Sequence, residues 1–200
     1  MGCWRDRWQD QQMPFVIVQL ANYDGRQQTG FPQPITPQTN PVNSGWAQLR
    51  EAQRTVAKAD PRAELAVIND LGETIDIHPL RKKEVAERIS LCFDKLLYNN
   101  KVKLSPEVVS TEVADGQVIL TLDQPIQPGE LSTFEVADDD RKFQNVEATG
   151  EGSRITILPP PSTLHTPRII RYAWKDNPIE ANVRSLTGLP MSSFELRIKK

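Results

Sequence analysis

Two spacings of hydrophobic residues divide the chain, and the first covers residues 15–98. Residues 15–20 and 64–69 are short apolar runs, which are typical of parallel strands covered on both faces. A helical spacing follows each run, over residues 43–60 and again beyond Pro79, whose missing N–H suits the first position of a helix. This order predicts a βαβα unit with a parallel sheet. The apolar positions that define the two helices are Trp46, Leu49, Ala52, Val56, Val85, Ile89, Cys92, Phe93 and Leu96.

From residue 101 onward the spacing becomes alternating, which indicates β-strands. Asp115 and Gly116 lie between two alternating runs, and this pair predicts a hairpin with a type I′ turn. We expect roughly six short strands that pack as a compact antiparallel sandwich. The expected strands cover residues 108–113, 117–122, 131–136, 143–148, 154–158 and 168–174.

The two spacings predict an α/β domain over residues 1–100 and an accessory β-sandwich over residues 101–200. Two parallel strands do not make a stable sheet, because their apolar faces and edges need neighbours. We therefore expect the α/β domain to be the C-terminal part of a larger one. Its missing N-terminal half is then an expected partner of this chain.

Composition and charge exclude several classes of protein. The chain has 38% apolar and 25% charged residues, as globular chains do, and its formal charge of −2 comes without a basic block. We therefore expect no nucleic-acid partner and no membrane partner. Cys3 and Cys92 do not form a disulfide framework, and two histidines with two cysteines make a zinc site improbable. No cofactor is implied, and the compartment is unknown.

His78 is the leading candidate for chemistry. It follows the expected strand over residues 64–69, at the carboxyl end where open parallel sheets bind ligands. A histidine there, with Asp70 and Asp76 nearby in sequence, is a candidate general base. The alternative is that His78 is a helix cap or a surface residue.

Other positions are candidates for binding or packing. Asn22 and Tyr23 follow the first expected strand at the same edge and could face a substrate, and Gln19 could either do so or bind backbone groups within the sheet. Residues 24–41 form a long loop rich in Gln, Gly, Thr and Pro, which is typical of a functional or disordered segment. On the helix over residues 43–60, we interpret Trp46 as a core anchor and Arg50 as a solvent-facing or salt-bridged residue.

Five short segments together resemble the C-terminal part of a sialate O-acetylesterase. They occur in the order of that family and span nearly the whole chain, so the resemblance is specific although each segment alone is weak. They are residues 15–23, residues 46–53, Ile77-His78-Pro79 with Lys82 or Lys83, residues 171–178, and Gly188-Leu189-Pro190 with Phe194.

The resemblance implies a hydrolase of the SGNH type, with a flavodoxin-like α/β domain in which a serine attacks an acetyl ester. His78 matches the histidine of that family, so it would accept the proton of the serine while a carboxylate orients its ring. The common pattern places an aspartate three residues before the histidine, where this chain has Ile75. Asp76 and Asp70 are therefore rival orienting groups, with a slight preference for Asp76.

The motifs that carry the nucleophile of the family, Gly-Gln-Ser-Asn and Gln-Gly-Glu-Ser, do not occur in this sequence. Ser44 is not a substitute, since it is better interpreted as a helix cap. We therefore expect a fragment that supplies the base and has negligible activity alone. The implied substrates are acetylated sialic acids, with acetylxylan or another polysaccharide as the alternative. A rival hypothesis is a truncated, non-catalytic protein whose β module binds carbohydrate.

Overall fold

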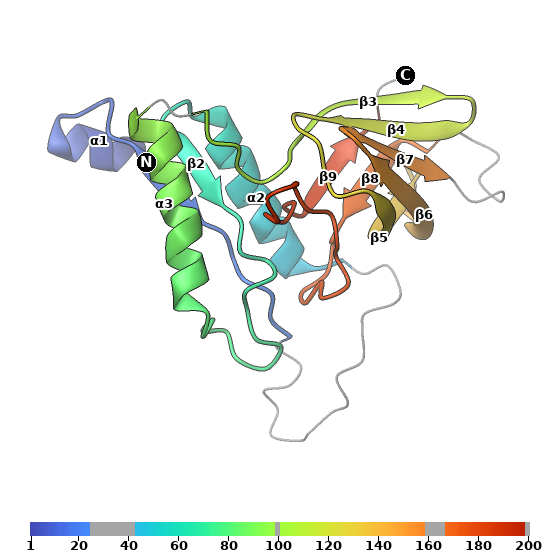
Figure 1. Ribbon diagram of the computed structural model, residues 1–200, viewed down its shortest axis with the longest axis horizontal. Coiled ribbons are helices and arrows are strands. Elements are labelled where there is room, and N and C mark those ends of the chain that lie inside the picture. Colours follow the sequence, from blue (N-terminus) through green and yellow to red (C-terminus); the bar gives the residue numbers. More distant parts are fainter. Residues whose placement is uncertain (25–42, 99–100, 159–166, 199–200) are drawn as a thin grey trace.

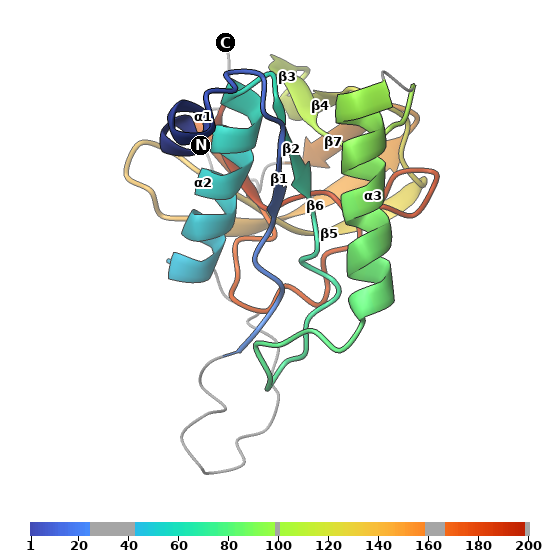
Figure 2. The same cartoon turned by 90° about the vertical axis from the view of Figure 1, so that its left-hand side faces the viewer.

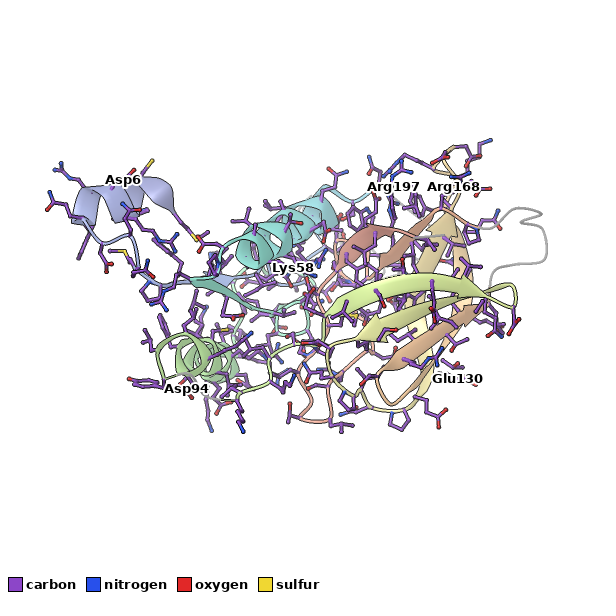
Figure 3. All side chains as sticks on the ribbon, turned by 90° about the horizontal axis from the view of Figure 1, so that it is seen from above. Asp6, Lys58, Asp94, Glu130, Arg168 and Arg197 are labelled. Carbon is purple, nitrogen blue, oxygen red and sulfur yellow. The ribbon has the colours of Figure 1, made fainter. Side chains whose placement is uncertain are left out.

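The computed structural model describes residues 1–24, 43–98, 101–158 and 167–198. The first unit contains a short helix, α1 (Gly2–Trp8), and two parallel strands, β1 (Phe15–Val18) and β2 (Ala63–Ala66), which pair from Phe15 with Ala63 to Val18 with Ala66. Helices α2 (Gly45–Ala59) and α3 (Lys82–Tyr98) lie on opposite sides of these strands (Figure 2). Figure 3 shows the same arrangement from above, with Lys58 on α2 and Asp94 on α3.

The predicted elements of this unit are present, with differences at their ends. Ser44 caps α2 as predicted, because its Oγ accepts a hydrogen bond from the backbone N–H of Ala47 at 2.9 Å. The prediction that Pro79 begins the second helix is wrong, since α3 begins at Lys82. The cause is local: the Asp76 carboxylate accepts the N–H of His78 at 2.8 Å, which makes a turn just before the proline. The long loop predicted over residues 24–41 lies, beyond Asp24, outside the described residues.

The β module is one curved, nearly barrel-shaped antiparallel sheet, in the order β3-β4-β7-β6-β5-β8-β9, rather than two packed sheets (Figure 1). Asp115 and Gly116 both have positive φ angles, 50° and 75°, as a type I′ turn requires. The last strand was not predicted. The strands are β3 (Val108–Ala114), β4 (Gln117–Leu122), β5 (Gly129–Ala137), β6 (Gln144–Glu151), β7 (Arg154–Leu158), β8 (Ile169–Tyr172) and β9 (Phe194–Arg197).

The hydrophobic core lies mainly in the β module. Leu120, Ile155 and Tyr172 are at most 1% exposed there, and many other apolar side chains pack around them. The α/β unit buries a small cluster of Ala21, Ile68 and Leu71, with Val85 against it. In contrast, several side chains expected on buried helix or strand faces are at least 38% exposed, namely Val18, Leu49, Val56 and Phe93. No described residue fully covers these four side chains.

Cys92 shows which face of α3 is covered. It is 1% exposed, and burial raises the pKa of its thiol to about 12, so the thiol is neutral at physiological pH. This confirms the interpretation of Cys92 as a small core residue. Cys3 is exposed on α1, and neither cysteine forms a disulfide.

Arg50 joins the two units, and its interpretation as a solvent-facing or salt-bridged residue is wrong. Its side chain is fully buried, and the guanidinium donates hydrogen bonds to four backbone carbonyls. Two of them follow β1, at Leu20 (3.0 Å) and Ala21 (3.0 Å), and two belong to the β module, at Lys175 (2.8 Å) and Asp176 (2.7 Å). The pKa of Arg50 is lowered by burial, with the charge of Asp176 opposing the shift.

Replacing Arg50 tests this joint. The substitution Arg50→Met keeps the buried stem but leaves four carbonyls without a donor, so we expect a loss of about 3 kcal/mol or more in the free energy of unfolding. Urea unfolding followed by tryptophan fluorescence measures the loss. The control Arg7→Met, at an exposed position of α1, should change the stability by no more than about 0.5 kcal/mol. If Arg50→Met and Arg7→Met are equally stable, the hydrogen bonds of Arg50 do not stabilise the joint between the two units.

Candidate active site

His78 lies on the loop that joins β2 to α3, beyond the carboxyl end of the parallel pair. Its Nδ1 is 3.1 Å from Oδ1 of Asp76, and the same oxygen accepts the backbone N–H of His78. The side chain of His78 is 82% exposed and that of Asp76 is 52% exposed. Hydrogen bonds from the backbone N–H and then the ring of His78 lower the pKa of Asp76. The pair therefore presents an imidazole whose Nδ1 is fixed by a carboxylate and whose Nε2 is open.

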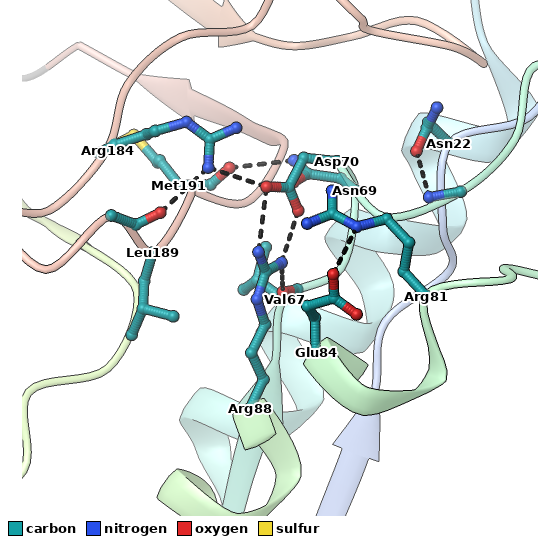
Figure 4. A network of polar contacts seen from close by, with 12 residues as sticks. Asn22, Val67, Asn69, Asp70, Arg81, Glu84, Arg88, Arg184, Leu189 and Met191 are labelled. Atoms are coloured by element: carbon teal, nitrogen blue, oxygen red, sulfur yellow. Dashed lines mark hydrogen bonds and ion pairs between the residues drawn. The ribbon is translucent and has the colours of Figure 1, made fainter. Parts of the chain in front are cut away.

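Asp70, the rival orienting group, binds two arginines instead (Figure 4). Its carboxylate receives hydrogen bonds from Arg88 on α3 and from Nη1 of Arg184 in the β module, the latter at 2.8 Å. Burial alone would raise the pKa of Asp70, but the hydrogen bonds from Arg88 and Arg184 outweigh it and lower the pKa. Asp70 thus ties β2 to α3 and to the β module, whereas Asp76 is the carboxylate in contact with His78.

Asn22 is buried in a chain of amide contacts that supports the loop of His78. Its Oδ1 accepts the N–H of Gly72 at 2.7 Å, and its Nδ2 donates to Oδ1 of Asn177 at 2.8 Å. Asn177 in turn donates to the hydroxyl of Thr74 at 3.1 Å. A Cβ on Gly72 would lie 2.1 Å from the carbonyl oxygen of Asn22, so only glycine allows this approach. Sequence reasoning missed Gly72 and Asn177 as supports.

Gln19 and Tyr23, the other predicted binding residues, also lie inside the fold. Gln19 is 1% exposed, and its Nε2 donates to the hydroxyl of Ser192 at 2.6 Å and to the carbonyl of Arg50 at 3.3 Å. The ring of Tyr23 packs on Trp46 with 5.5 Å between centroids. Trp46 is half-buried and donates from its indole N–H to the carbonyl of Ala21 at 2.7 Å. Gln19 therefore binds a backbone carbonyl of α2 and a serine of the β module, rather than backbone groups within the sheet.

Two cavities flank the parallel strands. A cavity of about 260 Å³ lies at their carboxyl ends, and its lining includes Asn22, Asp70, Glu73 and Arg184. A larger groove of about 640 Å³ lies at their amino ends, lined by the end of α2, the start of β2 and residues 101–105. Parallel sheets bind ligands at the carboxyl ends of their strands, so the smaller cavity is the candidate ligand site, and its lining includes residues of the His78 loop but not His78 itself.

Neither a nucleophile nor a metal site accompanies His78 in the described part of the chain. The hydroxyl of Ser44 donates to Oδ1 of Asp176 at 2.5 Å while it caps α2, and His78 forms side-chain hydrogen bonds only with Asp76. Over the described ranges, no group of three His, Cys, Asp or Glu residues could hold a metal ion. Likewise, no helix among the described elements is long and apolar enough to cross a membrane. Among the described residues, the arrangement therefore offers an imidazole held by a carboxylate, with no serine or cysteine side chain hydrogen-bonded to it.

The structure is similar to the crystal structure of a carbohydrate acetylesterase from Xanthomonas citri, with a TM-score of 0.79 and 29% sequence identity. The likeness covers 97% of this chain, and so both of its units. It covers 43% of the other chain, so this chain spans less than half of the length of that protein. No protein-family model matches the sequence, and no curated protein matches it.

The contact between Asp76 and His78 predicts a titration. Carbon-13 NMR of the Asp76 carboxyl should show a midpoint below the ordinary value of about 3.9. The substitution His78→Ala should raise it only partway, because the backbone N–H of residue 78 still donates to the carboxylate. Any stability that this contact contributes is then present above the ordinary pKa and is lost as pH falls through the lowered one.

The control for this titration is Ile75→Ala, because Ile75 is exposed and forms no hydrogen bond with Asp76. It should leave the midpoint unchanged. An ordinary midpoint in the unsubstituted chain would show that Asp76 does not hold His78 in solution.

Proposed function

We propose that this chain supplies the catalytic base of a carbohydrate O-acetylesterase that works by a Ser/His mechanism. The observation that carries the proposal is the pair of His78 and Asp76 on an open loop at the carboxyl end of the parallel strands. The similarity of both units to a carbohydrate acetylesterase supports it. The nucleophilic serine would come from outside this chain.

In this mechanism each residue of the pair moves or holds one proton. Nε2 of His78 takes the proton of the serine as its oxygen attacks the acetyl carbonyl, and Asp76 stabilises the imidazolium through Nδ1–H. His78 then gives the proton to the sugar oxygen as the carbon–oxygen ester bond breaks. A water molecule attacks the acetyl-enzyme, His78 accepts its proton, and acetate leaves as the proton returns to the serine.

The finer substrate class is part of the proposal. The resemblance of the five segments favours acetylated sialic acids, and acetylated plant polysaccharides are the alternative on the same scaffold. Release of acetate from acetylated sialic acid, compared with release from acetylxylan, distinguishes the two. Neither substrate requires a metal or an organic cofactor in this mechanism.

We further propose that the edge of β1 pairs with a strand of the α/β portion that bears the nucleophile. In the described residues, β1 pairs with β2 alone, which leaves its other edge without a hydrogen-bonded strand. Val18 on β1 and Leu49 on α2 are exposed apolar side chains nearby in the fold, and Trp4 and Trp8 on α1 are more than 60% exposed. The acetylesterase from Xanthomonas citri is longer than this chain, and its unmatched residues are long enough to include such a portion.

The chain alone should therefore hydrolyse a chromogenic acetyl ester no faster than buffer does. Joining it to an α/β portion that carries a Gly-Gln-Ser-Asn segment should restore turnover, because serine and base then meet across the sheet. Acetate release measures both. Turnover by the chain alone that is abolished in a His78→Ala variant would show that it already contains a nucleophile.

In the joined enzyme, the two carboxylates should separate by their effects. His78→Ala should lower kcat by about 10⁴-fold or more, and Asp76→Asn by roughly 10²-fold or more, since both act on the transferred proton. Asp70→Asn should instead lower the free energy of unfolding by roughly 2 kcal/mol, because it breaks a half-buried ion pair. The opposite result would make Asp70 the orienting carboxylate: a near-normal kcat in Asp76→Asn, together with a large loss of kcat in Asp70→Asn and no loss of its stability.

A further inference from the structure

The cavity of about 260 Å³ beside the loop of His78 has the size of a small ligand site. Its volume equals the share of roughly eight or nine water molecules in the liquid, below the usual range for drug-sized ligands. It lies between residues that follow the two parallel strands and residues 178–191 of the β module. It therefore has room for one ring between the loop that carries Glu73 and the β module.

Three side chains at this cavity have polar atoms that form no hydrogen bond with any described residue. The carboxylate of Glu73 forms no hydrogen bond or ion pair with any described residue. Its charge is one of several that raise the pKa of Arg81. Nε and Nη2 of Arg184 likewise donate to no described residue, and Oδ1 of Asn69 accepts from none. The cavity thus offers two acceptor groups to a ligand, the carboxylate of Glu73 and the amide oxygen of Asn69. It also offers two donor atoms, Nε and Nη2 of Arg184.

Two of these side chains, Arg184 and Asn69, are positioned by their other polar atoms. Nη1 of Arg184 donates to Asp70 at 2.8 Å and to the carbonyl of Gly188 at 3.0 Å, and Nδ2 of Asn69 donates to the carbonyl of Met191 at 3.0 Å (Figure 4). Glu73 directly follows Gly72, whose N–H is held by Asn22. Groups that are already fixed lose little freedom when a ligand binds.

An apolar side completes the cavity. Met191 and Pro190 are buried in its wall, and Ile179 lies at the cavity with 52% of its surface exposed. A sugar ring has hydroxyls around its rim and C–H groups on its faces, so it matches an arrangement of acceptors, donors and one apolar wall. The charged lining residues are Asp70, Glu73 and Arg184, and Asp70 also pairs with Arg88, so Glu73 is the carboxylate at this cavity without an ion-pair partner among the described residues.

We propose that this cavity is a subsite for a neutral sugar ring, bound by Glu73, Arg184 and Asn69 and packed against Ile179. The carboxylate of Glu73, which pairs with no described residue, disfavours an acidic sugar such as a sialic acid, because the two carboxylates would repel each other. The assignment of this ring to the acetylated substrate depends on the function proposed above, whereas sugar binding itself does not. Within that function, the subsite favours the alternative substrate class, a polysaccharide of neutral sugars, over the acetylated sialic acids that the resemblance alone favours.

Nitrogen-15 NMR of the 200-residue chain, titrated with methyl β-xyloside and separately with N-acetylneuraminic acid, tests the proposal. The neutral xyloside should shift the amide signals of residues 69–74 and 178–191, and the acidic sugar should not. Glu73→Ala should weaken xyloside binding about tenfold, because a hydrogen bond to a charged acceptor is lost. Ile179→Ala should weaken it by a smaller factor. The matched control Glu87→Ala, at an exposed glutamate on α3, should bind as the unsubstituted chain does.

The absence of xyloside shifts at these amides up to its solubility limit would overturn the subsite, as would shifts that Glu73→Ala leaves unchanged. Stronger binding of N-acetylneuraminic acid would overturn the preference for a neutral ring. These outcomes are independent of esterase activity. If the chain binds the sugar but the joined enzyme is inactive, only the proposed function is rejected. If the joined enzyme releases acetate and Glu73→Ala leaves its KM unchanged, only the subsite is rejected.

Discussion

The arrangement of the candidate site depends on the buried guanidinium of Arg50. Removing a cation from water is costly, and here four carbonyls offset the cost by accepting from a planar fork of donors. Those carbonyls belong to residues 20–21, just after β1, and to residues 175–176, so one side chain joins the two units. Asn177 follows directly and binds Asn22 and Thr74, which places the loop of His78 relative to the β module. Each step in this chain of contacts depends on the previous one.

Features that depend on neighbours in sequence were predicted well. The cap at Ser44 and the turn at Asp115 and Gly116 are present, because a cap needs only the next three residues and a tight turn needs only φ angles that its own residues adopt. The error at Pro79 is also local: a turn at Asp76 and His78 competed with the helix, and periodicity does not register that competition. Thus a cap or turn was predicted correctly where a single local interaction decided the backbone conformation.

Features that depend on distant partners were not predicted. The salt bridge between Asp70 and Arg184 joins residues 114 positions apart, so the sequence around Asp70 left it as an orienting group for His78. Arg50 lies on an amphipathic helix, where an arginine normally faces water, and its burial is explained by four distant carbonyls, two after β1 and two in the β module. The strand β9 is short and pairs with β8, so it was likewise missed. The contact of His78 with Asp76 could be predicted because the two residues are only two positions apart in the sequence.

The contrast between a rigid support and an exposed base has a consequence for catalysis. Asp76 already fixes the ring of His78, yet the 82% exposed imidazole is surrounded by water, which weakens every electrostatic interaction that a charged intermediate needs. The chain therefore provides orientation but not the exclusion of water. In the mechanism proposed here, the portion that pairs with β1 must do more than carry a serine: it has to cover His78, so docking and activation of the base are the same event.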